Sequence, residues 1–210
     1  MSAAGGPEPL ATAAKAGARE QKKHTTRNSL VQAAATLFAQ RGFSASSVDE
    51  IAAIAGLTKG AVYSNFEGKA DLALAVLEDR LDRPLRKIAT TGQEAEPSQR
   101  NRAASEMLLS HVQAQAPWFA LELELTAIAA RDPVLAAKLR ARDEAICAWV
   151  ASILSEVVGS SSKVPLDWLA KAFIAVGNGV ALDRLKGSHW ASRELLTAMF
   201  DAVLSWATGA

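Results

Sequence analysis

The sequence has one cysteine in 210 residues, and this scarcity limits how the chain can be stabilised. Cys147 alone cannot form an intrachain disulfide, so the sequence excludes a disulfide-stabilised secreted scaffold and indicates a reducing cytoplasm. Amid apolar neighbours, Cys147 is expected to be a small buried side chain rather than a redox switch. The histidines at 24, 111 and 189 are too scattered to suggest a metal site, so no metal is predicted.

Long apolar runs are also missing. No stretch approaches the roughly 18 apolar residues that a membrane-spanning helix needs, and charges bracket the two most apolar segments, Ala145–Ser155 and Ala172–Leu182. The first twenty residues contain Ala, Gly and Pro without an apolar block, so no signal peptide is expected. We therefore predict a soluble, cytoplasmic protein with no membrane partner.

Glycine and proline are few, whereas alanine is abundant. The chain has 13 Gly and 7 Pro against 44 Ala, and Ala loses the least free energy on entering a helix. The only strand-like alternation, Leu121–Leu125, has helical flanks. These observations predict an all-α fold.

Charge is nearly balanced over the chain but unevenly distributed along it. Residues 1–27 carry five positive and two negative charges, whereas the remainder carries eighteen positive and twenty negative. Such a basic arm is typical of a phosphate-seeking tail and equally of a solvated one. Because residues 1–21 show no apolar periodicity, we predict that they are disordered.

Residues 22–72 have the helix boundaries of a helix-turn-helix domain. A periodic apolar pattern predicts a first helix that ends at Gly42. Ser47 and Glu50 form a capping-box pattern that opens a second helix, and Gly56 ends it. Thr58 can cap a third helix that runs to about residue 66, which completes a three-helix N-terminal domain.

The rest of the chain is predicted to be a second helical domain over residues 90–210. A fourth helix continues from about Lys69 to about residue 89 and joins the two domains, and a polar loop follows over 90–100. Pro and Gly then mark five further helices, at about 100–115, 117–131, 133–158, 165–186 and 190–208.

The third helix has two distinct faces at about 100° per residue. Val62 and Phe66 mark its buried side. The opposite side carries small residues: Gly60, Ala61 and Ser64. Small side chains allow close approach to a DNA major groove, where Ala61 can touch a thymine methyl and Ser64 can bond a base or a phosphate. Tyr63 and Asn65 flank this face and can reach the DNA backbone.

The run AAATLFAQRGFSASSVDEIAAIAGLTKGAVYSNFEGKADL, residues 33–72, resembles the DNA-binding domain of the TetR family of bacterial transcriptional regulators. The resemblance implies that Thr58, Lys59, Tyr63 and Lys69 contact phosphates and that the small residues face the bases. Asn65 departs from the family, which commonly has an aromatic residue there. The full predicted set of DNA contacts is Arg27, Ser46, Ser47, Thr58, Lys59, Gly60, Ala61, Tyr63, Ser64, Asn65 and Lys69.

Beyond residue 90 the resemblance is weaker, although residues 123–139 look like the regulatory domain of one branch of the family. The family builds a four-helix dimer interface from its last two helices. The predicted dimer contacts are therefore Val176, Val180, Leu195, Leu196, Met199 and Val203. An intrachain core is the alternative for each of them.

All five tryptophans lie in the second domain, a concentration that can indicate an apolar pocket. Glu122 falls within an apolar helical arc, so it must be paired or protonated; a cationic ligand could meet it, but we favour an internal arginine such as Arg102. His111 is either a pocket donor or a satisfied core histidine, and we favour the second. The predicted pocket residues are Met107, His111, Trp118, Phe119, Glu122, Trp149 and Phe173.

The resemblance to the TetR family implies a ligand-responsive repressor that binds a palindromic double-stranded DNA operator as a homodimer. Its effector would be an unidentified lipophilic small molecule. A regulator without a small-molecule effector and a helical ligand-binding protein without a DNA role are the alternatives. Phosphate-binding loops, zinc helices and nucleophile turns are absent from the sequence, so neither an enzyme nor a cofactor is predicted.

Overall fold

The computed structural model describes residues 8–83, 86, 99–158, 162–188 and 190–209. All of its regular elements are helices, with no strand in these ranges, which confirms the predicted all-α fold. The chain divides into two compact units between Val76 and Leu77. Each unit has its own core.

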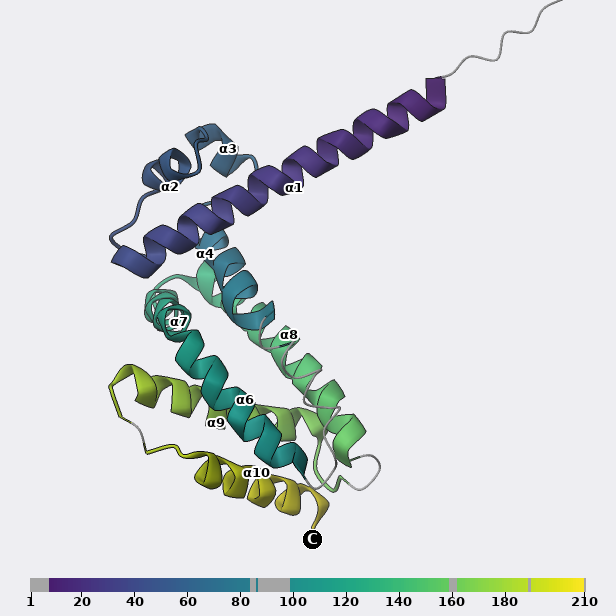
Figure 1. Cartoon of the computed structure of the whole chain (residues 1–210), viewed down its shortest axis with the longest axis vertical. Helices are drawn as coiled ribbons and strands as arrows, with labels where there is room; N and C mark the ends of the chain where they lie inside the picture. Colours follow the sequence, from purple (N-terminus) through teal and green to yellow (C-terminus); the bar gives the residue numbers. More distant parts are fainter. Residues whose placement is uncertain (1–7, 84–85, 87–98, 159–161, 189, 210) are drawn as a thin grey trace, which may run out of the picture. The chain divides into compact units, whose positions relative to one another are not determined.

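The N-terminal unit contains three helices and most of a fourth (Figure 1). They are α1 (Glu8–Arg41), α2 (Val48–Ile54), α3 (Lys59–Tyr63) and α4 (Lys69–Leu77). The core is formed by Leu30 and Ala34 of α1, Ile51 of α2, Val62 of α3 and Leu72 of α4, all of them fully buried. Every helix therefore contributes an apolar side chain, and α3 is held through a single one, Val62.

The start of α1 differs from the prediction. The helix begins at Glu8, so the expected disorder is wrong for residues 8–21; residues 1–7 lie outside the described part of the chain. This segment is rich in Ala, Lys, Arg, Glu and Gln, which are strong helix formers, and it continues without a break into the packed half of α1. Apolar periodicity indicates packing, and residues 17–21 of this segment are exposed, so a helix can form there without that pattern.

The predicted turns of the N-terminal unit are confirmed. Gly42 and Gly56 have φ angles of 76° and 66°, the left-handed region that glycine adopts without strain. Ser47 and Glu50 form a complete capping box at the start of α2. However, α3 ends at Tyr63, before the predicted residue 66.

The predicted fourth helix continues beyond α4 with a change of winding, and Arg83 and Arg86 are also helical. A π-helical turn, η1 (Glu78–Asp82), follows α4 directly, whereas residues 84, 85 and 87–89 of the predicted continuation lie outside the described residues, as does most of the 90–100 loop. The wider turn places Leu81 and Asp82 in buried positions of the C-terminal unit.

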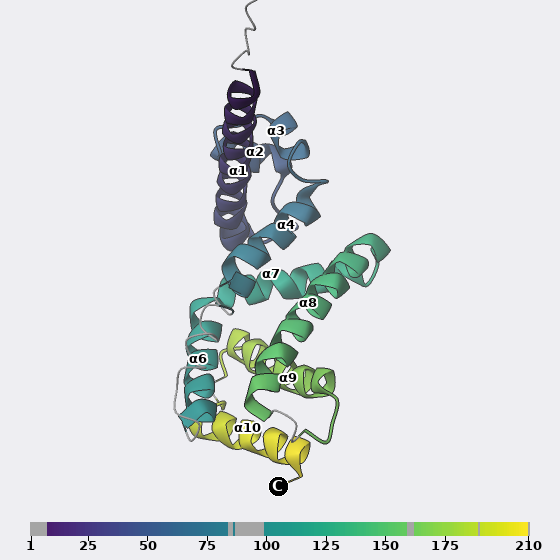
Figure 2. The same ribbon diagram turned by 90° about the vertical axis from the view of Figure 1, so that its right-hand side faces the viewer.

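The C-terminal unit is built from η1 and five helices, whose boundaries follow the predicted pattern. They are α6 (Arg100–Ala114), α7 (Ala116–Ala129), α8 (Pro133–Val158), α9 (Leu166–Leu185) and α10 (Arg193–Thr208). α9 lies between α8 and α10 (Figure 2), and α6 packs along α10. One core cluster gathers around Val112, Val180 and Leu196, and a second around Leu154 and Leu169.

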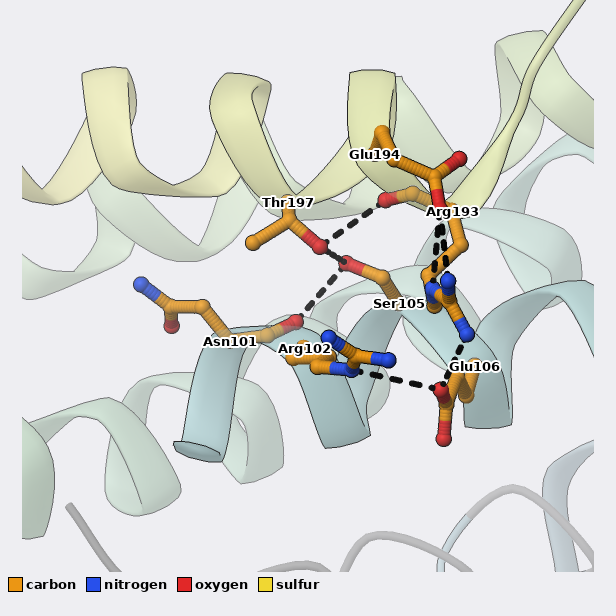
Figure 3. A network of polar contacts seen from close by, with 7 residues as sticks. All are labelled: Asn101, Arg102, Ser105, Glu106, Arg193, Glu194 and Thr197. Carbon is orange, nitrogen blue, oxygen red and sulfur yellow. Dashed lines mark hydrogen bonds and ion pairs between the residues drawn. The ribbon is translucent and has the colours of Figure 1, made fainter. Parts of the chain in front are cut away.

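A polar network joins α6 to α10 (Figure 3). The fully buried Ser105 donates a hydrogen bond of 2.7 Å to the carbonyl oxygen of Asn101, and its hydroxyl lies 3.2 Å from that of Thr197 on α10. At the surface, Arg193 pairs with Glu106 at 2.9 Å. One buried contact and one surface ion pair therefore connect α6 with α10.

The structure corrects the predicted dimer contacts. Val180 and Leu196 are fully buried within the chain, so the intrachain alternative holds for both. Val176, Met199 and Val203 are partly buried against the same cores, whereas Leu195 is 40% exposed. Helices α9 and α10 are apolar on more than one face, so sequence alone could not separate inner from outer residues.

Candidate nucleic-acid interface and ligand cavity

Helix α3 and its two cap residues expose five of the eleven predicted DNA contacts: Thr58, Lys59, Gly60, Tyr63 and Ser64. Thr58 caps the helix, because its Oγ1 accepts the backbone N–H of Ala61 at 3.3 Å. Gly60, Ser64 and Tyr63 are exposed, Tyr63 to 54%, whereas Ala61 is half-buried. The sequence therefore places small side chains and one tyrosine on the outward face, as predicted from the helical angles.

Lys59 stands at the start of this surface and has a partner. Its ammonium lies 3.0 Å from Oδ2 of Asp49 on α2, and both side chains are more than half exposed. The hydrogen bond and charge of Asp49 raise the pKa of Lys59 above its usual value. A phosphate approaching α3 would therefore compete with Asp49 for this lysine.

Lys69 has a different role from the predicted phosphate contact. Its ammonium donates to the carbonyl oxygens of Phe43 at 2.9 Å and Ser46 at 2.8 Å, and it lies 4.2 Å from the centre of the Phe43 ring. Ser46 is also internal: only 4% exposed, it donates its hydroxyl to the carbonyl of Gly42. Both residues hold the turn between α1 and α2, a role that sequence spacing could not distinguish from phosphate binding.

The remaining predicted contacts border α3 or support it. Arg27 places its guanidinium 4.7 Å from the centre of the Phe66 ring. Ser47 is occupied in its capping box. Asn65 donates its amide to the carbonyl of Ala61 at 2.8 Å, while its buried Oδ1 has no hydrogen-bond partner among the described residues. An aromatic residue at position 65 would have no such oxygen. The departure from the family at Asn65 therefore leaves one buried polar atom unpaired among the described residues.

The C-terminal unit contains a cavity of about 780 Å³. Its lining includes six of the predicted pocket residues: Met107, His111, Phe119, Glu122, Trp149 and Phe173. Trp118 is a correction, because it is absent from the lining and packs with its ring centre 5.8 Å from the guanidinium of Arg80. Cys147 lines the cavity too and is only partly buried, contrary to the expectation of a buried position.

A buried arginine at the cavity wall escaped the sequence analysis. Arg142 of α8 donates to both carboxylate oxygens of Asp82 in η1, at 2.9 and 2.6 Å, and to Oε1 of Glu122 in α7 at 2.6 Å. Burial would lower the pKa of Arg142, but the hydrogen bonds and charges of Asp82 and Glu122 outweigh it and raise the pKa. The internal partner expected for Glu122 is thus Arg142, whereas Arg102 lies beside Glu106.

His111 does not fit the favoured expectation of a satisfied core histidine. It is 2% exposed, and neither ring nitrogen has a hydrogen-bond partner within the described part of the chain. Burial lowers the pKa of His111, although the negative charge of Asp82 opposes this effect. The ring meets Phe119 edge-on at 6.0 Å. The alternative of a polar group available to a ligand therefore gains support.

Within the described residues, no group of three His, Cys, Asp or Glu side chains is placed to hold a metal ion. None of the described helices combines the length and the apolar character that a bilayer crossing needs.

Residues 30–76 match the family described as "Bacterial regulatory proteins, tetR family". The transcriptional repressor KstR2 of Mycolicibacterium smegmatis is 45% identical over 56 residues, which are 27% of each chain. The transcriptional activator FasR of the same organism is 31% identical over 137 residues, 63% of this chain and 60% of FasR. The chain thus aligns with 27% to 60% of the length of these two relatives.

The fold is shared more widely than the sequence. The structure of the fatty acid degradation regulator FadR from Bacillus halodurans superposes with a TM-score of 0.64, covering 85% of this chain and 94% of FadR at 18% identity. The helix-turn-helix match lies in the N-terminal unit, and the structural likeness extends over both units. Residues 30–76 thus carry the N-terminal domain of the tetR family of bacterial regulatory proteins, and the chain as a whole shares its fold with solved regulators.

Proposed function

We propose that the chain is a transcriptional regulator that binds a palindromic DNA operator as a homodimer and releases or engages it in response to a small molecule. The observation that carries the DNA-binding part is the exposed face of α3, where Gly60, Ser64 and Tyr63 stand beside Lys59. Two-fold symmetry would present one such helix to each half of the operator.

Gly60 supports a close approach of α3 to DNA. A Cβ added at Gly60 would meet only Oγ1 of Thr58, at an ordinary contact distance of 3.7 Å. No internal contact therefore requires glycine at this position, and its backbone conformation is helical. A missing side chain on an exposed recognition helix fits a backbone that lies against a DNA groove.

The outer faces of α9 and α10 support the homodimer. Four large apolar side chains remain 40% to 58% exposed on these two helices: Trp168, Leu182, Leu195 and Trp206. Large apolar surface on a folded unit is typical of an interface, and a two-fold axis would bury the same residues from both copies. This outer set replaces the buried Val180 and Leu196 as the proposed contact.

Substitution of Trp206 by glutamate is expected to shift the chain from dimer to monomer. A charge at this position would be buried without a partner in the dimer, so the dissociation constant should rise by roughly 100-fold. Sedimentation velocity at micromolar concentration measures the change. Val134→Glu is the matched control, since Val134 is 68% exposed at the start of α8. A Trp206→Glu variant that stays dimeric, with Val134→Glu monomeric, would place the interface elsewhere.

Regulation by a small molecule is supported by the cavity and its charged wall. Arg142 and its two carboxylates join η1, α7 and α8, and η1 directly follows α4 in the chain. A ligand that moves these elements in the cavity would alter the link to the DNA-binding unit. FadR of Bacillus halodurans is described as a fatty acid degradation regulator, which agrees with an apolar effector. KstR2 is a repressor and FasR an activator, so the sign of regulation is left open.

Fluorescence anisotropy with DNA from upstream of the chain's own gene tests the DNA-binding proposal. Binding should be at least about a thousandfold tighter than to a scrambled fragment, and its logarithm should fall linearly with the logarithm of salt concentration. Tryptophan emission provides a second measurement in the same titration. All five tryptophans follow residue 117, so a change in their emission reports on the C-terminal unit rather than on direct DNA contact. Equal affinity for both fragments would count against an operator in this region.

A further inference from the structure

Two kinds of polar group lie in the more buried part of the cavity lining, whereas the lining residues Arg140, Asp143, Glu144, Asp167, Lys171 and Asn178 are exposed. One is the cluster of Arg142, Asp82 and Glu122, whose members are bonded to one another. The other is His111, whose two ring nitrogens are buried with no partner supplied by the described residues. Around them the lining is largely apolar, with Met107, Phe119, Trp149, Phe173 and Phe200 among its members.

The charged cluster is unsuited to an anionic ligand. One guanidinium faces two carboxyl groups at 2.6 Å, so the cluster has more acidic than basic groups. Asp143 adds a further carboxylate 3.7 Å from Arg142. A carboxylate or phosphate entering the cavity would be dehydrated and would meet this excess of acidic groups, which disfavours its binding.

The cluster is also poorly available to a cation. Both oxygens of Asp82 accept hydrogen bonds from Arg142, and one oxygen of Glu122 does so as well. An ammonium group would have to give up its hydration shell, and the carboxylates that it would meet are already paired with Arg142. The charges of this cluster are thus largely satisfied without a ligand.

The ring nitrogens of His111 are unpaired within the described residues, so they can bind an uncharged polar group of a ligand. Burial favours its neutral form by lowering its pKa, and a neutral imidazole has one donor and one acceptor nitrogen. A buried polar atom without a partner is costly, so a ligand group that pairs with it gains more than an exposed hydrogen bond would provide. An uncharged hydroxyl, carbonyl or amide can do so without bringing a charge into the apolar cavity.

We propose that this cavity takes an uncharged, largely apolar molecule that presents one hydroxyl, carbonyl or amide group to the ring of His111. This inference rests on the proposed function in treating the cavity as the effector site, and it names the chemical class of that effector. His111 selects the head group, and the aromatic and aliphatic walls hold the apolar body. The charged cluster rejects ionised analogues of the same length.

Three probes with the same ten-carbon chain separate the head groups: decan-1-ol, decanoate and decylammonium. Binding to the full-length chain at pH 7.5, without DNA, is measured by titration calorimetry and by the emission of Trp149, which lines the cavity. Decan-1-ol is expected to bind saturably and roughly tenfold or more tighter than either ion. Equal or tighter binding of an ion, or no saturable binding of decan-1-ol, would overturn the proposal.

The variant His111→Phe tests which residue reads the head group, because it keeps a ring and removes both nitrogens. Its affinity for decan-1-ol is expected to fall by roughly 5- to 20-fold. Met107→Leu, one helical turn earlier on α6 and also in the lining, is the matched control and should stay within about twofold of the wild type. An unchanged affinity in a folded His111→Phe chain would overturn the assignment of His111.

The probe comparison on the unmodified chain keeps the test decisive even where His111→Phe fails to fold. DNA affinity is measured separately with and without decan-1-ol. Decan-1-ol that binds in the expected order but leaves operator affinity unchanged would support the ligand class and count against ligand-controlled regulation. The two ideas can therefore fail independently.

Discussion

Replacing Arg142 by methionine is expected to lower the free energy of unfolding by about 3–5 kcal/mol, because two carboxylates would remain in the protein without their cation. Only 11% of the Arg142 side chain and 8% of that of Asp82 are exposed. Urea denaturation, followed by tryptophan emission, measures the loss in the C-terminal unit. A loss of this size is a large part of the stability of an ordinary domain.

Two comparisons identify the cause of that loss. Arg193→Met removes a surface arginine that pairs with Glu106 and Glu194, and it should change stability little because such pairs are solvated. Combining Arg142→Met with Asp82→Asn and Glu122→Gln removes the uncompensated charges and should restore much of the lost stability. A triple variant no more stable than Arg142→Met would show that packing, rather than charge, explains the effect.

Replacing Lys59 by alanine is expected to weaken operator binding by roughly tenfold per protomer at low salt. The slope of the salt dependence should fall by about one phosphate contact per protomer. Two protomers bind one operator in the proposed complex, so the combined loss would approach about 100-fold. Removing Lys59 also leaves Asp49 facing the DNA without its cation. Anisotropy titrations over a range of salt concentrations measure both quantities.

Two other substitutions serve as controls for Lys59→Ala, one expected to tighten DNA binding and one expected to leave its salt dependence unchanged. Asp49→Asn removes the competing carboxylate and should tighten binding to all sequences. Lys69→Met removes a lysine that holds the carbonyls of Phe43 and Ser46, so it should lower thermal stability without changing the salt dependence. An unchanged salt dependence for Lys59→Ala would contradict the placement of α3 against DNA.

Local signals made most helix boundaries predictable from the sequence. The capping box at Ser47, the turns at Gly42 and Gly56 and the proline that begins α8 act over a few residues, so their effects can be inferred without the fold. The angular positions of residues 59–66 at about 100° per residue likewise located the exposed face of α3. These are the parts of the molecule in which neighbouring residues determine the outcome.

Partners distant in sequence could not be inferred in this way. Arg142 lies sixty residues beyond Asp82 and twenty beyond Glu122, and several other arginines were equally available to Glu122 before the helices packed. Lys69 reaches back over more than twenty residues to two carbonyl oxygens, which have no side-chain signature. Whether Leu196 is inside or at an interface depends on the crossing of α6 and α10.

Helix α1 combines two thermodynamic behaviours along one continuous element. Residues 17–25 are exposed on every side, whereas Leu30 and Ala34 are fully buried. An unpacked helical segment of this length is marginal in water, so its hydrogen bonds can open at a small cost while the packed half stays closed until the whole unit unfolds. The C-terminal half of α1 therefore forms a rigid support for α2, whereas its N-terminal segment frays, so that the length of the helix varies at equilibrium.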